Sequence, residues 1–277
     1  MEDFFGVDPV GTHELGFDGA HVVKRYRSWD RGEPRREWRA LGLLARYAPG
    51  LAPEPVRADL GGEPPSVVMS RLPGEPLGAG PVTPDQLDAI AEAVERLHTA
   101  VPARVLDSVG PVNLPPPATL ARVRAMAALR GVPRDPRMSR ALESARAWLD
   151  SGWVERDARG SERAAVFGQS DGNLANFLAD GGRVALVDYE DSGRSDRAFE
   201  PAAFVEHLSV WACGGIRAEP FLSRFGLTAA ERERVRGLRR LFGCFRLVML
   251  LPGGPSRRRN PPGTAERQAT WLLDLLG

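Results

Sequence analysis

Lysine is the scarcest charged residue in this sequence. Of the 37 lysine and arginine residues, only Lys24 is a lysine, and it lies near the end of the β-like stretch AHVVKRY at residues 20–26. An ammonium is a compact point charge suited to nucleotide phosphates, whereas a guanidinium is a planar fork of different reach. Lys24 is therefore a candidate phosphate-binding residue, and a surface lysine is the alternative.

Cysteines and long apolar runs are also scarce. Cys213 and Cys244 stand far apart in apolar helical patterns, which predicts buried free thiols in a reducing compartment rather than a disulfide or a metal site. No apolar run approaches the roughly 20 residues of a membrane-spanning helix. The first residues, MEDFFGVDPV, are acidic and lack the basic start of a secretion signal. We therefore expect a cytoplasmic protein without a membrane partner.

Neither sign of charge dominates the chain. Its 37 basic and 36 acidic residues are interspersed and leave a net charge of +1, so there is no concentrated field suited to nucleic acid. With 277 residues, of which 43% are hydrophobic, the chain can bury the core of one large domain or of two lobes. Small-molecule chemistry is the function class that this composition favours.

The first 80 residues predict strands and one helix. THELG at 12–16 and AHVVKRY flank an Asp-Gly turn, and VRAD at 56–59 and SVVMS at 66–70 flank a second turn. Between these two hairpins, residues 34–48 begin with a proline and place apolar side chains on one helical face. A β-rich segment with a single main helix is the expected structure.

After a Pro/Gly-rich connector near residues 70–82, the pattern changes to long helices. Capping boxes begin at Thr83 and at Thr228. Helices are predicted near residues 84–97, 118–130, 137–150, 197–212, 229–250 and 264–276. One β-like interruption at 176–191 predicts a hairpin. The basic segment GGPSRRRNPPG at 253–263 is a connector between the last two helices, with a lid over a binding site as the alternative.

Polar residues gather around the predicted hairpin. Asp171 and Asn176 lie in the loop QSDGNLAN that enters it, and Asp188 follows its second strand. Asp and Asn are common in turns, so the first pair alone carries little information. Two carboxylates and an amide oxygen brought together are, however, suited to Mg²⁺. With Lys24 and Glu37 earlier in the chain, the set matches the parts that phosphoryl transfer requires.

These residues resemble the motifs of the aminoglycoside phosphotransferase and choline kinase-like group. QSDGNLAN at 169–176 is similar to its His-Gly-Asp-x4-Asn catalytic loop, with Gln169 in place of the histidine, and LVDYED at 186–191 is similar to its Ile-Asp-Trp/Phe-Glu metal motif. The resemblance implies an α+β, two-lobed, protein-kinase-like fold. Residues 1–72 would form the small β-rich nucleotide-binding lobe. Residues 73–277 would form a larger helical lobe that contains the catalytic hairpin and binds the acceptor.

The resemblance also implies roles for the individual residues. Asp171 would be the catalytic base, and Asn176 and Asp188 would be the Mg²⁺ ligands. Lys24 would contact the phosphates of ATP or GTP, and Glu37 would be its ion-pair partner. The residues expected beside the nucleotide base are Met69, Ser70 and Leu72. In GRSDRAFEPAAF at 193–204, Asp196 would support the catalytic loop by hydrogen bonds.

Four acidic residues after the metal motif are candidates for the acceptor site: Glu190, Asp191, Glu200 and Glu206. They could line a cleft for a cationic acceptor, or simply be acidic residues on an exposed helix. The four histidines lie outside the catalytic motif, so the sequence suggests no histidine mechanism.

The predicted activity is Mg²⁺-dependent transfer of the γ-phosphate of ATP or GTP to a hydroxyl of a small molecule. Aminoglycosides and other antibiotics, choline-like amines and sugars are candidate acceptors. A nucleotide-binding pseudokinase without turnover is the alternative, because Gln169 replaces the usual histidine. The acceptor, the choice between ATP and GTP and the oligomeric state stay open at this point.

Overall fold

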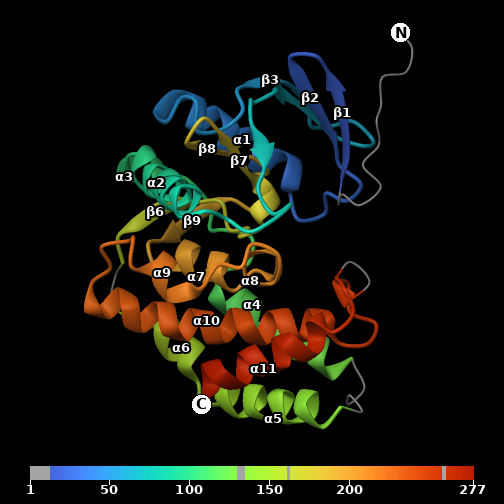
Figure 1. Ribbon diagram of the computed structural model, residues 1–277. Helices are drawn as coiled ribbons and strands as arrows, with labels where there is room; N and C mark the ends of the chain where they lie inside the picture. Colours follow the sequence, from blue (N-terminus) through green and yellow to red (C-terminus); the bar gives the residue numbers. More distant parts are fainter. Residues whose placement is uncertain (1–12, 130–134, 161–162, 258–259) are drawn as a thin grey trace.

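The computed structural model describes residues 13–129, 135–160, 163–257 and 260–277. An antiparallel sheet with one long helix forms the upper lobe, and a larger helical lobe lies below it (Figure 1). The predicted α+β, two-lobed fold is therefore confirmed. Parts of three predicted elements lie outside the described ranges: Thr12 in the first strand, Arg130 at the end of the helix expected near 118–130, and residues 258–259 in the last connector.

The upper lobe contains four antiparallel strands in the order β1-β2-β4-β3. They are β1 (Glu14–Asp18), β2 (His21–Arg25), β3 (Pro55–Asp59) and β4 (Ser66–Ser70). Both predicted hairpins are present, and Gly19 supplies the left-handed backbone, φ 61°, that the first turn requires. Helix α1 (Glu33–Tyr47) buries Leu41 and Leu44 and packs beside β3 and β4.

A second, three-stranded sheet lies between the lobes. Its central strand, β7 (Phe177–Asp180), pairs with β8 (Arg183–Leu186) in the hairpin that the sequence predicts. The short strand β5 (Glu75–Pro76), inside the predicted connector, pairs with the other edge of β7. The N–H of Leu186 donates to the carbonyl oxygen of Leu51 at 2.8 Å, so the hairpin is fastened directly to the segment that follows α1.

The lower lobe consists of helices and one further strand pair. The helices are α2 (Pro84–Ala100), α3 (Ala103–Leu106), α4 (Pro116–Ala128), α5 (Pro136–Asp150), α6 (Trp153–Ala158), α7 (Phe199–Val205), α8 (Leu208–Ala212), α9 (Ala218–Leu222), α10 (Ala229–Leu250) and α11 (Thr264–Leu276). Strand β6 (Ala165–Gly168) precedes the hairpin in the chain and β9 (Gly193–Asp196) follows it, and the two strands pair with each other in antiparallel orientation. Both predicted capping boxes form, and α10 packs against α4, α7 and α11.

Two predictions about this lobe are wrong. The single helix expected over 197–212 is two helices, because the ring of His207 accepts the N–H of Ser209 and starts α8 from an extended backbone. Cys213, expected to be buried, is exposed where α8 ends, whereas Cys244 is buried as predicted; both thiols are free. Within the described ranges, no helix is both long and apolar enough to cross a membrane.

Candidate active site

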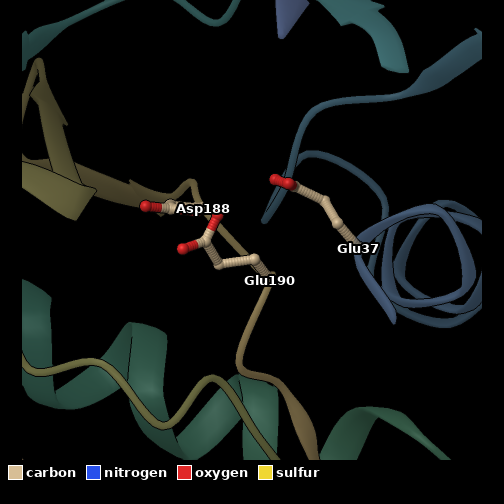
Figure 2. A group of neighbouring side chains, drawn as sticks. All are labelled: Glu37, Asp188 and Glu190. Carbon is tan, nitrogen blue, oxygen red and sulfur yellow. The ribbon is translucent and has the colours of Figure 1, made fainter. Parts of the chain in front are cut away.

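Lys24 is buried at the junction of the two lobes. Its side chain comes from β2, and the residue is 5% exposed, so the surface-lysine alternative is wrong. The ammonium Nζ lies 2.7 Å from Glu37 Oε2, 2.6 Å from Asp188 Oδ1 and 2.8 Å from Glu190 Oε2. Figure 2 shows that Glu37 comes from α1, whereas Asp188 and Glu190 come from the segment after β8. One ammonium therefore joins elements from both lobes.

The carboxylates around Lys24 keep it charged. Burial by itself lowers the pKa of a lysine, but Asp188 and Glu37 outweigh this effect and raise the pKa of Lys24 well above its usual value. Burial also raises the pKa of Asp188 to about 7, although Lys24 opposes the shift. A buried lysine that carries its full charge is suited to holding an anion.

Glu37 is fixed in place by three donors. The Tyr26 hydroxyl and Lys24 Nζ both donate to its Oε2 atom, and the backbone N–H of Tyr189 donates to Oε1 at 3.2 Å. The exposed fraction of Glu37 is 1%. Because each of its oxygens has a partner, the carboxylate holds the lysine in one position, as expected for its ion-pair partner.

Gln169 holds the catalytic loop and the metal motif together. Its Nε2 atom donates to the carbonyl oxygen of Val187 and, at 3.4 Å, to that of Asp188. Asp188 has a φ of 65°, a left-handed conformation that a non-glycine residue adopts only when its surroundings impose it. The amide of Gln169 thus tethers this strained segment. Gln169 stands at the position where the similar motif usually has a histidine.

Asp171 and Asn176 are in direct contact. Asn176 Nδ2 donates to Asp171 Oδ2 at 3.0 Å, and the N–H of Asn173 donates to Oδ1 at 3.2 Å. The backbone carbonyl of Asn176 accepts the N–H of Val187 at 3.0 Å, which places Asn176 beside the residue that precedes Asp188. The hairpin therefore brings together Asp171, Asn176 and Asp188, as the sequence analysis expects.

His207 is a neighbour of Asp171 that sequence reasoning missed. Its Nε2 atom lies 3.7 Å from Asp171 Oδ1. Burial, with a smaller contribution from Arg246, lowers the pKa of His207 well below its usual value. Nδ1 accepts the N–H of Ser209 at 3.2 Å and lies 2.7 Å from Ser209 Oγ, so Nε2 is the ring nitrogen nearer to Asp171. The one signal in the sequence was a polar His-Leu-Ser step within an apolar helical pattern.

The four acidic residues considered for the acceptor site lie in different parts of the structure. Glu190 belongs to the Lys24 cluster and also lies 2.7 Å from His13 Nε2. Asp191 Oδ1 accepts Asn113 Nδ2 at 2.6 Å.

Glu200 and Glu206 are buried in the lower lobe. Glu200 Oε2 accepts the backbone N–H groups of Gln169 and Ser170 at 3.2 and 3.0 Å. Glu206, 0% exposed, accepts Arg239 Nε at 2.8 Å and Trp271 Nε1 at 2.6 Å. Neither carboxylate lines an open cleft.

The support of the catalytic loop therefore comes from Glu200 rather than from Asp196. Asp196 forms a two-point ion pair with Arg234, with distances of 3.1 and 2.7 Å, and accepts the N–H of Ala198. Burial raises the pKa of Glu200 to about 7, while the N–H groups of Ser170 and Gln169 oppose this shift. The expectation for Asp196 is thus corrected: its ion pair joins the start of α7 to α10.

The residues expected beside the nucleotide base lie where β4 leaves the upper sheet. Met69 is buried in β4, and Leu72 is partly exposed after it. Ser70 is hydrogen-bonded to Glu54, since its N–H donates to the carbonyl of Glu54 and its hydroxyl accepts the N–H of Glu54. Nearby, the exposed Phe17 ring at the first turn lies 5.5 Å from the guanidinium of Arg71.

The oxygens suited to a metal are divided between two groups. Carboxylate oxygens of Glu37, Asp188 and Glu190 lie within 4.8 Å of one another, but the Lys24 ammonium contacts all three. The sequence-based expectation instead assigns Mg²⁺ to Asn176 and Asp188, an amide oxygen and a carboxylate. Asn176 Nδ2 donates to Asp171, and Asp188 Oδ1 accepts Lys24 Nζ.

The assembled groups are of the kinds that phosphoryl transfer requires. The family model for the phosphotransferase enzyme family matches residues 14–238 of the chain. The chain belongs to this phosphotransferase family. No curated protein sequence matches it.

Solved structures resemble the chain over nearly its whole length. Choline kinase LicA from Streptococcus pneumoniae is 16% identical, with a TM-score of 0.66, and the match covers 99% of this chain and 92% of that one. Aminoglycoside phosphotransferase APH(4)-Ia, in complex with AMP-PNP and hygromycin B, is 18% identical, with a TM-score of 0.68 and coverage of 99% and 93%. The enzyme APH(3'')-Id from Streptomyces rimosus, with ADP and streptomycin, is 17% identical, with a TM-score of 0.61 and coverage of 88% and 93%.

Proposed function

We propose that the protein transfers the γ-phosphate of ATP or GTP to a hydroxyl of a small molecule. One observation carries this proposal: Lys24 of the upper lobe pairs with Asp188, 164 residues later in the chain, and the preceding Val187 is hydrogen-bonded to the backbone of Asn176, which contacts Asp171. A site built only for stability would gain little from burying so many charges around one ammonium. Family membership and the nucleotide complexes of the structural neighbours agree with the proposal.

Each residue has a defined task in this reaction. Lys24, held by Glu37, binds the phosphates of the nucleotide. Asp171 accepts a hydrogen bond from the acceptor hydroxyl, orients it toward the γ-phosphate and receives its proton late, because the transition state of phosphoryl transfer is loose. Burial raises the pKa of Asp171, whereas Arg246, the N–H of Asn173 and the amide of Asn176 oppose this shift and favour the ionised carboxylate.

Mg²⁺ would be held by Asn176 and Asp188 together with the nucleotide phosphates. When bound, the ion neutralises the charge that develops on the phosphate oxygens.

Asp188→Ala should weaken the Mg²⁺-dependent affinity for ADP by about tenfold or more, because it removes the only carboxylate of this pair. The measurement is a calorimetric ADP titration with Mg²⁺ and with EDTA. Identical titrations of wild type and variant would show that the metal lies elsewhere.

A pseudokinase without turnover is the second candidate. It rests on Gln169, which stands where the family loop usually has histidine. The hydrogen bonds of Gln169 to Val187 and Asp188 argue against it, since the amide holds the loop in place. The catalytic Asp171 and its contact with Asn176 are also intact.

Turnover on a panel of acceptors tests the function. Purified protein with Mg²⁺ and either ATP or GTP would be incubated with aminoglycosides, other hydroxylated antibiotics, choline-like amines, sugars and hydroxy acids. Mass spectrometry should detect at least one product that is heavier by one phosphoryl group. Nucleotide binding with no product from any acceptor would favour the pseudokinase.

A further inference from the structure

Arg246, near the catalytic loop, has no hydrogen-bonding or ion-pair partner among the described residues. It lies on α10, and within the described chain it forms no ion pair and no hydrogen bond, although its Nε atom is buried. The guanidinium carbon lies 5.6 Å from the ring centroid of Phe245. A buried N–H group without an acceptor is costly, so such a group in a folded protein needs an explanation.

The carboxylates near Arg246 do not provide that partner. It lies close enough to Asp171, Asp191 and Glu206 for their charges to oppose the lowering of the Arg246 pKa by burial. Each of these carboxylates already accepts other donors: Asn173 and Asn176 on Asp171, Asn113 on Asp191, and Arg239 and Trp271 on Glu206. The arginine fork is therefore left available beside the catalytic aspartate.

A second unpaired donor among the described residues lies on α8. Trp211 Nε1 is buried and has no acceptor among the described residues. The Trp211 ring stacks on Trp271, with ring centroids 5.9 Å apart and planes 10° apart, and Trp271 in turn donates to Glu206. The charge of Glu206 also raises the pKa of Arg246, which lies on α10. Both orphaned groups are donors, so a ligand that satisfies them must supply acceptor oxygens.

We propose that Arg246 binds an oxyanion of the acceptor, a carboxylate or a phosphate, and that the substrate is a hydroxylated anion rather than a polycation. This inference rests on the proposed phosphotransferase function. A guanidinium matches such oxyanions through two parallel hydrogen bonds. Of the four acidic residues considered for a cationic acceptor, Glu200 and Glu206 are buried and already paired, Glu190 contacts Lys24, and Asp191 accepts Asn113.

Hexoses of different charge provide matched probes. Glucuronate, glucose 6-phosphate, glucose and glucosamine share one ring and differ in the charge that they carry. Their affinities would be measured by calorimetry in the presence of Mg²⁺ and AMP-PNP. Wild type should bind at least one of the two anions about tenfold more tightly than glucose, the size of one charge-assisted contact, and should bind glucosamine most weakly. The stronger anion distinguishes a carboxylate from a phosphate site.

Three variants assign the preference to Arg246. Arg246→Gln should abolish it, Arg246→Lys should retain part of it, and the exposed Arg236→Gln, which changes net charge equally on the same helix, should leave it intact. AMP-PNP affinity should stay within about twofold in all three. If Arg246→Gln does not fold, Arg246→Lys decides, because a loss of half or more of the preference in a folded protein is still required.

The outcomes separate this inference from the function on which it rests. Failure of wild type to bind AMP-PNP, or to phosphorylate any acceptor, would contradict the proposed function. Tighter binding of glucosamine than of both anions, equal or undetectable binding of all four hexoses, or an unchanged preference in Arg246→Gln would overturn the role of Arg246. In those cases the phosphotransferase assignment would stand.

Discussion

At the scale of single residues, the clearest feature is a lysine kept in a chain that otherwise uses arginine. The three carboxylates around Lys24 Nζ converge at 2.6 to 2.8 Å. A guanidinium is too wide to occupy this point and still reach a phosphate. Lys24→Arg should therefore lower kcat/KM by at least about a hundredfold despite its conserved charge.

The matched control is the reverse substitution on the neighbouring residue, Arg25→Lys, which should leave kcat/KM within about twofold. Both variants would be assayed with the acceptor found in the panel, after circular dichroism has shown that they fold. Near-normal turnover of Lys24→Arg would remove Lys24 from the phosphate-binding role.

Glu200 predicts a dependence of stability on pH. Burial raises its pKa from the usual 4.5 to about 7. Between these values the folded protein binds more protons than the unfolded chain, so the contribution of Glu200 to stability falls as pH rises. Glu200→Gln keeps an oxygen for the loop N–H groups but cannot ionise. Its Tm relative to wild type should therefore rise between pH 5 and pH 8.

Thermal unfolding at the two pH values measures this effect. The exposed Glu233→Gln serves as the control, since it removes the same charge from a solvated position. Equal pH dependence in wild type and Glu200→Gln would mean that the buried carboxylate stays ionised throughout this range.

At the scale of elements, the packing of α10 depends on one glycine. A Cβ atom at Gly237 would overlap the ring of Trp153, the first residue of α6. Gly237→Ala should therefore destabilise the protein by about 1 to 3 kcal/mol, although alanine usually favours a helix. Gly42 in α1 is the control, because a Cβ there meets no heavy atom within 4 Å. Gly42→Ala should stabilise by about 0.4 to 1 kcal/mol.

Chemical denaturation measures both changes in the free energy of unfolding. The opposite signs are the decisive result, since both substitutions add the same methyl group within a helix. Stabilisation by Gly237→Ala would show that α6 and α10 pack less closely than described.

Elements with local signals could be predicted from the sequence. The capping boxes at Thr83 and Thr228 and the turn at Gly19 each depend on residues that are close together in the sequence, and each is present as predicted. The break at His207 could not be predicted, because a single histidine cap interrupts an otherwise helical pattern. The four-residue helix α3 and the two-residue strand β5 carry too little periodicity to detect.

The site was predictable to the extent that its residues lie within motifs. Asp171, Asn176 and Asp188 follow from spacing and resemblance. The role of Glu200 and the positions of His207 and Arg246 depend on which helices pack beside the catalytic loop, and nothing local encodes that arrangement. For the same reason Glu206 was expected at a cleft, whereas its partners Arg239 and Trp271 come from α10 and α11.

At the scale of the whole molecule, the site exists only because the lobes meet. Besides the Lys24 pair, Arg36 Nη1 of α1 donates to the carbonyl oxygens of Pro111 and Ser192 at 2.8 Å each. Arg39 Nη2 donates to the Ser108 carbonyl at 2.6 Å. These bonds hold the upper lobe, which carries Lys24, against the lower lobe. We therefore expect nucleotide binding to require both lobes, and chemistry to depend on one residue of the lower lobe.

That residue is Asp171, and its conversion to asparagine is the most direct test of the central claim. Asparagine keeps the shape of the side chain but cannot orient the hydroxyl as a charged acceptor or take its proton. Asp171→Asn should bind Mg·ATP within a few-fold of wild type and lower kcat by roughly 10² to 10⁴. A variant that transfers phosphate at the wild-type rate would contradict the assignment of Asp171 as the catalytic residue.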